Sequence, residues 1–313
     1  MNSPDISVVL PVYNGKKYLD ESVSSVLSQT FETFELVICD DASQDTSRDL
    51  IARYDDPRIR VLANDQNRGL FPTLNRLLRA SRTPLIRLWS QDDRMKPRCL
   101  EVEADFWAKH PDLGMSFCLR DHIDADGNTT WTAPQDRSSS VLSPRHMVQS
   151  SFYHGSPPGN ISTVMLNREA LRTVGPFRPD MTYSGDFELW VRLSKQHETG
   201  VIAQSLVDLR FHAGQLSRQN VMLSKIREDQ EVVRRLLERL PDHLQGHARI
   251  YNRWHRHVRY AHHMMKSALK GRWHEAAQTF RLLHNVDSPG WVLLLWLISA
   301  NGRWFKPEPK FDL

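Results

Sequence analysis

Two neighbouring carboxylates in the first third of the chain could hold a divalent cation. They are Asp92 and Asp93, in the segment Ser90-Gln91-Asp92-Asp93, with a proline following at position 97. Hard oxygen ligands on a short turn suit Mg²⁺ or Mn²⁺, whose other positions go to substrate phosphates. A bound cation also stabilises the negative charge of a departing phosphate group. An isolated Asp-Asp pair is more often a capped turn with solvated carboxylates, so its surroundings decide between the two interpretations.

Three other side chains could add binding and proton-transfer chemistry. Asp41 could accept a hydrogen bond from a base N–H or a ribose hydroxyl, whereas Asp40 beside it could be only a helix cap. Asp186, at the start of a predicted helix, could act as a general base toward an acceptor hydroxyl or could cap that helix. His212, in the polar turn that follows Arg210, could ligate a metal or bind phosphate, although a lone histidine is more often a surface residue.

The elements that precede these residues predict that they meet at one edge of a sheet. Short β-rich runs alternate with amphipathic helices, which predicts a mostly parallel sheet joined by right-handed crossovers. Strands are expected over 6–12, 34–39, 58–62 and 85–89, with helices over about 18–29, around 50–51, and over 72–80. The polar segments that follow the strands are Tyr13-Asn14, Asp40-Asp41, Asn67 and Asp92-Asp93. Because ligands bind outside the carboxyl ends of such strands, this convergence favours a cation site at Asp92-Asp93.

The rest of the chain changes character twice. Residues 121–160 are expected to be loops with a short hairpin around Asp126-Gly127. The elements expected after them are a strand over 161–166, a helical turn over 169–174 and a helix over 187–193, in which Glu188 pairs with Arg192. Beyond about residue 220 the chain is predicted to be wholly helical, with a helix–turn–helix hairpin over 268–276.

Length and composition indicate a soluble α/β protein. The 313 residues suffice for one large domain or a catalytic domain with an appendage, and 40% are hydrophobic. The cysteines at positions 39, 99 and 118 form no CxxC pair, which favours reduced, mostly buried thiols and a cytoplasmic location. No signal peptide is expected. The apolar run Trp291–Ala300 is about half of the roughly 20 residues that span a bilayer, and predicts a buried helix or a membrane-surface contact.

Charge is unevenly distributed along the chain. From residue 220 onward there are sixteen Lys and Arg against nine Asp and Glu, a local net charge of +7; the whole chain carries +4, so residues 1–219 carry −3. An acidic front suits a metal-dependent site, and a basic tail suits a membrane surface or a lipid diphosphate, although a solvated helical face explains the tail equally well. Trp291, Trp296 and Trp304 with the surrounding arginines favour docking at a membrane surface; acceptor recognition and dimerisation are the other roles considered for the tail.

Missing motifs exclude several enzyme classes. The sequence has no GxGxxG, no GxxxxGK[ST] and no GxSxG, which excludes a dinucleotide-binding fingerprint, a P-loop and a nucleophile elbow. His274-Glu275 is followed by Gln278 where a zincin needs its second histidine. A sugar nucleotidyltransferase needs a Gly-rich phosphate loop after its first strand, and Tyr13-Asn14-Gly15-Lys16-Lys17 is a poor version of one.

Taken in order, the motifs closely resemble those of the family 2 glycosyltransferases over roughly residues 5–217. They are Ser7–Gly15, Ser25–Phe31, Glu35–Thr46, Asn67–Asn75, Trp89–Pro97, Ser162–Met165, Val174–Phe177, Gly185–Leu193 and Arg210–His212. The resemblance implies a GT-A fold, a Rossmann-like α/β sheet flanked by helices, and a hexosyltransferase-type enzyme that inverts the anomeric carbon. It also implies a UDP- or dTDP-sugar donor, a glycan or lipid-linked acceptor, and a role in polysaccharide biosynthesis of the cell envelope.

The resemblance also assigns roles to individual residues. It implies donor-nucleotide contacts, a metal site for Mg²⁺ or Mn²⁺, and Asp186 as the catalytic base. The donor contacts are expected at Pro11, Tyr13, Asn14, Asp41, Asn67 and Gln91, and the metal ligands at Asp92, Asp93 and His212. The expected domains are a catalytic domain over 1–219, with a donor half over about 1–97 and an acceptor half over about 98–219, and a helical extension over 220–313.

Two positions depart from the family pattern. The first carboxylate of the family's DxD motif is replaced by Ser90, which could weaken the metal site or shift the ribose contact. The glutamate of the family's Glu-Asp pair is replaced by Gly185. An active enzyme remains the favoured interpretation, with a non-catalytic nucleotide-sugar binder and a sugar nucleotidyltransferase as alternatives. A cytoplasmic location, at the inner face of the membrane if the tail docks there, completes the expectation.

Overall fold

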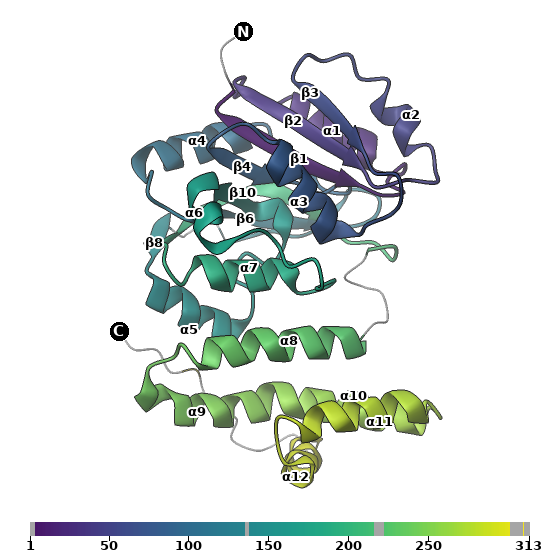
Figure 1. The fold of residues 1–313 in the computed structure, drawn as a ribbon, viewed down its shortest axis with the longest axis vertical. Coiled ribbons are helices and arrows are strands. Elements are labelled where there is room, and N and C mark those ends of the chain that lie inside the picture. The colour runs from purple at the N-terminus through teal and green to yellow at the C-terminus, as the bar shows by residue number, and fades with distance from the viewer. Residues whose placement is uncertain (1–3, 135–137, 216–221, 301–308, 310–313) are drawn as a thin grey trace. The chain divides into compact units, whose positions relative to one another are not determined.

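The chain divides into two compact units, which are described separately. The computed structural model describes residues 4–134, 138–215, 222–300 and 309 (Figure 1). The first unit comprises Met1–Met147 and Ser156–Gln219, and the second comprises Val148–Gly155 and Asn220–Leu313. The predicted domain division at residues 219 and 220 stays a prediction, since a short segment before residue 156 groups with the C-terminal helices.

The first unit is built on one mixed sheet. The strands among the described residues are β1 Ile6–Val12, β2 Phe34–Asp40, β3 Ile59–Ala63, β4 Leu85–Leu88, β5 Arg94–Met95, β6 Met115–Ile123, β7 Thr129–Trp131, β8 Ser140–Leu142, β9 Val164–Asn167 and β10 Thr199–Arg210. Their order is β3-β2-β1-β4-β9-β6-β10-β5, with β7 beside β6 and β8 beside β10. Strands β1 to β4 are parallel, β9 is antiparallel to both of its neighbours, and β6 is parallel to β10. The carboxyl ends of β1, β2, β3, β4, β6 and β10 therefore lie at the same rim.

Helices flank this sheet and bury its apolar runs (Figure 1). They are α1 Leu19–Leu27, α2 Ser47–Ile51, α3 Leu70–Ala80, α4 Cys99–Lys109, α6 Arg168–Val174 and α7 Gly185–Leu193. A further helix, α5 Pro144–His154, spans the division between the two units and lies mostly in the second. The even-numbered residues of β1 pack in one core cluster with apolar side chains of α1, α2 and α4, while α3 packs on β1 and β2. Strands that are covered on both faces read as continuous hydrophobic runs, which is why Ile6–Val12 and Phe34–Asp40 are recognisable in the sequence.

The predicted α/β fold is confirmed, while some elements of the acceptor half differ from expectation. The hairpin around Asp126-Gly127 is present as β6–β7. The expectation of loops over 121–160 is wrong for α5, whose pattern is not amphipathic because the polar Gln149 and Ser151 are fully buried. No element was expected where α4, β6 and most of β10 lie.

The second unit is helical, as expected, over the described residues that follow residue 221. Its helices are α8 Met222–Leu237, α9 Asp242–Asn252, α10 Val258–Leu269, α11 Trp273–His284 and α12 Pro289–Ala300, with a π-helical turn over Arg253–His257. The predicted helix–turn–helix is confirmed as α10 and α11, joined through Gly271, whose φ of +72° suits glycine. Trp304, one of the tryptophans considered for membrane docking, lies outside the described residues. No helix in the described ranges is long and apolar enough to cross a bilayer.

Candidate functional site

Two of the predicted metal ligands meet at the carboxyl ends of β4 and β10. His212 Nε2 lies 3.1 Å from Asp92 Oδ2, and both side chains are 18% exposed. Ser90 Oγ donates to the other oxygen, Asp92 Oδ1, at 2.6 Å, so the hydroxyl at the departing DxD position orients the carboxylate that remains. Burial by itself would raise the pKa of Asp92, but the hydrogen bonds from His212 and Ser90 outweigh it and lower that pKa. The Asp92 carboxylate is therefore charged at neutral pH.

Asp93 lies beside this pair but contacts the protein with both of its carboxylate oxygens. Oδ2 accepts from Ser162 Oγ at 2.5 Å and Oδ1 accepts from the backbone N–H of Arg210 at 2.9 Å. Burial raises the pKa of Asp93 well above its ordinary value, and the neighbouring charge of Asp92 adds to the effect. These contacts tie the turn after β4 to the end of β10. The assignment of Asp93 as a metal ligand stays a prediction.

Arg210 holds the backbone of Asp92 and belongs to a chain of alternating charges. Its guanidinium, in a side chain 2% exposed, donates to the backbone oxygen of Asp92 at 2.9 Å and to Glu21 Oε2 at 2.5 Å. Its Cζ lies 4.6 Å from the ring centroid of Tyr18, and that ring lies 4.9 Å from the His212 ring. The buried Tyr18 hydroxyl has no hydrogen-bond partner among the described residues.

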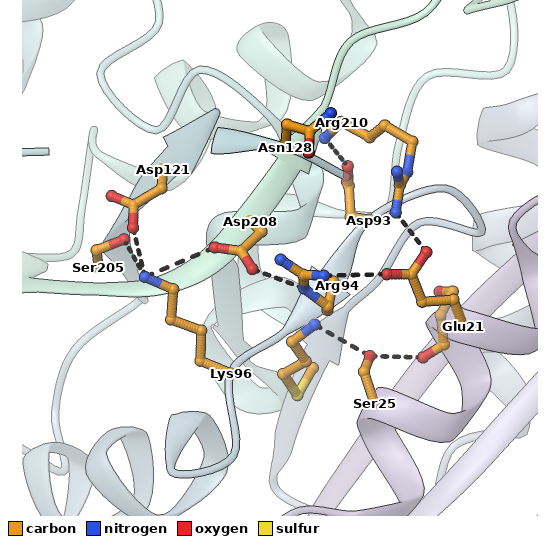
Figure 2. Close-up of polar contacts among 12 residues, drawn as sticks. Glu21, Ser25, Asp93, Arg94, Lys96, Asp121, Asn128, Ser205, Asp208 and Arg210 are labelled. Atoms are coloured by element: carbon orange, nitrogen blue, oxygen red, sulfur yellow. Dashed lines mark hydrogen bonds and ion pairs between the residues drawn. The ribbon is translucent and has the colours of Figure 1, made fainter. Parts of the chain in front are cut away.

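The chain of charges extends from Arg210 across the end of the sheet (Figure 2). Glu21 also pairs with Arg94 at 3.2 Å, and Arg94 pairs with Asp208 at 2.8 Å. Beyond Asp208 the chain continues through Lys96 to Asp121. Sequence analysis missed these residues. The available signal was the period-two spacing of Asp208, Arg210 and His212, which places polar side chains on one face of a strand end.

Asp41 organises the loop between β3 and α3. Its carboxylate accepts from Asn64 Nδ2 at 2.6 Å and from the backbone N–H groups of Arg68 at 2.9 Å and Gly69 at 2.8 Å. The Gly69 N–H also donates to Asn67 Oδ1 at 2.9 Å, so two predicted donor-binding residues share one backbone group. Asp41 is 3% exposed, whereas Asn67 is exposed. The base contact assigned to Asp41 stays a prediction.

The other predicted donor-binding residues gather around the end of β1. Gln91 holds the backbone of Tyr13 at both groups, because Oε1 accepts from the Tyr13 N–H at 2.9 Å and Nε2 donates to the Tyr13 oxygen at 3.0 Å. Asn14 Oδ1 accepts from the backbone N–H of Gln44 at 2.8 Å, which links the turns after β1 and β2. Pro11 lies in β1, paired with Cys39 of β2. The Tyr13 side chain is exposed.

Asp40 does not cap α2, whose N-cap residue is Thr46; the nearest carboxylate to the helix start is that of Asp45. Asp45 Oδ1 accepts from the Ser47 N–H at 3.0 Å, at the first residue of α2. Asp40 instead accepts from Arg48 Nε at 2.5 Å and, weakly, from the Ser43 N–H at 3.3 Å. Asp40 therefore stabilises the turn after β2.

Asp186 is the second residue of α7, where its Oδ1 accepts from the Phe187 N–H at 2.7 Å. The residue before it, Gly185, packs against Phe71 of α3: a Cβ at Gly185 would lie 2.6 Å from Phe71 Cε2. Phe71 also stacks on Phe177, with ring centroids 5.3 Å apart. The Phe71 ring therefore occupies the space that a side chain would need at position 185, where the family pattern has a glutamate.

Glu188 serves the structure of this region, as predicted. Its carboxylate pairs with Arg192 Nε at 2.8 Å, four residues along α7. Arg192 also donates to the backbone oxygens that follow α6, at Val174, Gly175 and Pro176. The pair fixes α7 against the end of α6.

The donor set fits a cation that is only partly ligated by protein. No group of three or more His, Cys, Asp or Glu side chains within the described ranges is arranged to hold a metal ion. The Asp92–His212 pair supplies one charged oxygen and one imidazole nitrogen, and Mg²⁺ typically takes one or two carboxylates plus substrate phosphates. The residues present therefore fit a Mg²⁺ or Mn²⁺ ion that is completed by a diphosphate.

Solved structures share this fold. The crystal structure of S. aureus TarS 1–349 in complex with UDP-GlcNAc matches with a TM-score of 0.70 at 18% identity, over 93% of this chain and 83% of that one. The complex of the same protein with UDP matches with a TM-score of 0.59 at 18% identity, over 79% of this chain and 69% of that one. Both likenesses confirm the GT-A architecture expected from the sequence.

Sequence relatives give the family. EpsE of Bacillus subtilis (strain 168) is 29% identical over 246 residues, which are 75% of this chain and 77% of EpsE. The Escherichia coli UDP-Glc:alpha-D-GlcNAc-diphosphoundecaprenol beta-1,3-glucosyltransferase WfgD is 25% identical over 223 residues, 71% of this chain and 81% of WfgD. Residues 7–175, more than half of the chain, match the family model described as glycosyl transferase family 2. The chain therefore belongs to glycosyl transferase family 2 and is a glycosyltransferase.

Proposed function

We propose that this enzyme transfers a sugar from a UDP- or dTDP-linked donor to a glycan or lipid-linked saccharide, with inversion at the anomeric carbon. The observation that carries the proposal is the Asp92–His212 pair, held at the carboxyl ends of β4 and β10 in a family 2 domain. The names of the relatives support uridine donors and a lipid-linked acceptor, because TarS was solved with UDP and UDP-GlcNAc and WfgD is named for a diphosphoundecaprenol acceptor. The reaction would be a step in cell-envelope polysaccharide synthesis.

The nucleotide would bind along the turns that follow β1 and β3. Tyr13, 39% exposed and held at its backbone by Gln91, offers an aromatic ring for a base. Asn67 presents its amide from the loop that Asp41 organises. Pro11 and Asn14 would complete this surface. Asp41 would contact the base only through the small exposed part of its buried carboxylate.

The diphosphate would lie at the Asp92–His212 pair. These two residues would hold Mg²⁺ or Mn²⁺, which when bound supplies a Lewis acid for the charge that develops on the leaving nucleoside diphosphate. Ser90 donates to the carboxylate of Asp92 and Arg210 donates to its backbone oxygen, so the side chain and the backbone of Asp92 are both held in place. Asp93 would act mainly by fixing the turn, given the protein contacts of both its oxygens.

Asp186 would take the proton of the acceptor hydroxyl. As that proton leaves, the acceptor oxygen forms its bond to the anomeric carbon and the bond from that carbon to the diphosphate oxygen breaks, so the anomeric configuration inverts. The N–H of Phe187 donates to one oxygen of Asp186 and fixes the carboxylate at the start of α7.

Donor hydrolysis and transfer test the proposal. The purified protein with UDP-sugars and Mn²⁺ is compared with Asp92→Asn, Asp92→Ala, Asp186→Asn and Asp186→Ala, and with Asp126→Asn as a control in the exposed β6–β7 turn. Turnover is expected to fall by about 10²–10⁴-fold in the Asp92 and Asp186 variants, as loss of a proton-transfer or charge-stabilising group predicts. NMR of the product's anomeric proton reports inversion.

The outcomes separate the alternatives. Equal turnover in wild type and all variants would contradict the assigned site. No turnover with any donor, despite tight nucleotide-sugar binding, would favour a non-catalytic binder. Release of pyrophosphate from a nucleoside triphosphate and a sugar 1-phosphate would indicate a nucleotidyltransferase.

We also propose that α12 contacts the inner face of an anionic membrane. Its side chains Val292 and Trp296 belong to the core of the second unit, whereas Trp291, Leu294 and Leu297 are 44–59% exposed. Exposed apolar helix faces of this kind favour a lipid surface, and the tail's net charge of +7 favours anionic lipid.

Vesicle co-sedimentation tests this contact. The variant Trp291→Ser/Leu294→Ser is expected to bind vesicles with 30% anionic lipid at least about tenfold more weakly than wild type, since two interfacial side chains are lost. Trp131→Ser, an exposed tryptophan of the first unit, is the matched control. Undiminished binding of the double variant would show that α12 does not mediate the contact.

A further inference from the structure

A cavity of about 510 Å³ lies within the second unit, away from any residue assigned a role above. Its lining comes from the end of α5, from α8 and α9, and from the π-helical turn with the start of α10, all of which belong to that unit. The lining includes Tyr153, Asp229, Tyr251, Trp254, Arg256 and Arg259. Three aromatic rings and two guanidinium groups thus share one cavity with a single carboxylate.

The aromatic wall of the cavity is preformed. The Tyr251 hydroxyl donates to the Tyr153 backbone oxygen at 3.0 Å, and the two rings meet edge to face with centroids 4.8 Å apart. His255 stacks on the other side of Tyr251, with centroids 4.0 Å apart. A wall held in this way needs little ordering when a ligand packs against it.

The π-helical turn Arg253–His257 gives the cavity its cationic side. It forms part of a continuous helical stretch from α9 into α10, and π-helical turns are mostly single-turn interruptions of α-helices that are frequent at functional sites. Trp254 and Arg256 line the cavity from this turn. The turn therefore supplies an aromatic and a cationic lining residue from three consecutive positions.

The charges of the cavity favour an anion. Arg256 is 6% exposed, lies over the Phe152 ring at 5.2 Å and donates to the Phe152 backbone oxygen and to Asn252 Oδ1. These contacts fix its guanidinium within the unit, where it adds positive charge to the cavity. Arg259 is exposed, and its Nε donates to the His255 backbone oxygen at 2.8 Å, so the guanidinium is anchored at one nitrogen. Asp229 already accepts a hydrogen bond from the Tyr260 hydroxyl. The cavity lining thus carries two guanidinium groups and one carboxylate, which leaves it a net positive charge.

We propose that this cavity binds a saccharide that carries a phosphate group, as a second contact for the acceptor. The flat apolar face of a sugar ring packs well on Tyr and Trp rings. A guanidinium fork matches the oxygens of a phosphate. A phosphate-linked glycan and the sugar diphosphate of a lipid carrier share this chemistry. The assignment to an acceptor rests on the glycosyltransferase activity proposed above.

Ligand-observed NMR titrations on the full chain test the inference. The probes are glucose 1-phosphate, glucose and inorganic phosphate, applied to wild type, Arg259→Gln and Trp254→Leu. Wild type is expected to bind glucose 1-phosphate better than either fragment, and each variant to bind it at least about tenfold more weakly, the usual effect of losing a charge-assisted hydrogen bond or an aromatic contact. Arg281→Gln, an exposed arginine of α11 outside the cavity, is the matched control and should bind as wild type does.

The outcomes bear on this inference separately from the activity. Equal binding of glucose 1-phosphate by wild type and Arg259→Gln overturns it, as does binding of inorganic phosphate as tight as that of glucose 1-phosphate. Because glucose 1-phosphate could also enter the donor site, only the binding lost in the two cavity variants counts in support. Donor hydrolysis is measured on the same samples. If hydrolysis is present and cavity binding absent, only this inference fails; if hydrolysis is absent, the proposed function fails whatever the cavity binds.

Discussion

Replacing Gly185 with alanine tests how Asp186 is positioned. An added Cβ would lie 2.6, 2.8 and 2.9 Å from three ring carbons of Phe71. Carbon atoms pack at about 3.5–4.0 Å, so α7 or the Phe71 ring must move by about 1 Å. Phe71 is 2% exposed and stacked on Phe177, which leaves the ring little room. We therefore expect the helix start, and Asp186 with it, to shift.

The magnitude follows from two opposing effects. Overpacking a core contact costs about 1–3 kcal/mol, while alanine gains about 0.5–1 kcal/mol over glycine in a helix. With the middle value of each range, Gly185→Ala should lower the free energy of unfolding by about 1 kcal/mol. A displacement of about 1 Å at the base should lower turnover by about 10–100-fold. Gly246→Ala in α9, where nothing lies within 4 Å of the added Cβ, should instead stabilise by about 0.5–1 kcal/mol.

A double-mutant cycle identifies the clash as the cause. Phe71→Leu alone should destabilise by about 1–2 kcal/mol because it leaves a cavity. Combined with Gly185→Ala it should cost at least about 1 kcal/mol less than the sum of the single changes, and should recover part of the turnover. Urea unfolding followed by tryptophan fluorescence and donor hydrolysis measure the two effects. Wild-type stability and turnover in Gly185→Ala, or strict additivity in the cycle, would refute the reasoning.

Three further predictions concern charge and burial. Glu35→Gln should lower the free energy of unfolding at pH 7 by about 1–3 kcal/mol. Burial by itself raises the pKa of Glu35, but the hydrogen bonds from Ser7 and Arg60 outweigh burial and lower that pKa. The stabilisation by Glu35 is therefore present above about pH 4.5 and is lost as the pH falls through the lower folded-state pKa. Urea midpoints from pH 7.5 to 3.5 should therefore converge for the two proteins. Glu21→Gln removes the carboxylate beside buried Arg210 and should lower the free energy of unfolding by about 1–2 kcal/mol, a value reduced because the Glu21 side chain is half-exposed. The same variant should bind Mn²⁺ more weakly, as measured by electron paramagnetic resonance. Unchanged Mn²⁺ affinity would show that Glu21 does not support the Asp92 site. Burial raises the pKa of Cys39 to about 11, so a disulfide reagent at pH 8 should label it only after unfolding, and rapid labelling of the folded protein at this cysteine would contradict its burial.

The sequence predicted best the part of the fold in which burial is continuous. Strands β1, β2 and β4 are covered on both faces, so each reads as an apolar run and ends at a polar segment. The GT-A fold and the family followed from these runs and their motifs. Strand β10 was missed because its 12 residues mix charged and apolar side chains, and its register against β6 is shifted at Ile202–Val207. Periodicity is a weak signal in such a strand.

The candidate site was predictable in its residues but not in its contacts. Asp92 and His212 are 120 residues apart, and no local pattern predicts that they share a hydrogen bond. Ser90 looked like a lost carboxylate, yet its hydroxyl orients Asp92. Gly185 looked like a lost neighbour of Asp186, and only the structure shows Phe71 packed against it. Both departures make sense through partners that are distant in sequence.

The order of the strands has a consequence for how the protein folds. Strands β1 and β2 pair residues 28 apart in the sequence, whereas β4 and β9 pair residues 78–82 apart and β6 and β10 pair residues 84–87 apart. Long-range pairings close late, because the entropy of a large loop is lost before its contacts form. His212 follows the last of these strands, so it reaches Asp92 only after the non-local half of the sheet has formed. A nascent or partly folded chain therefore carries the nucleotide-facing turns before it carries the Asp92–His212 pair, and appearance of that pair marks the end of folding of the first unit.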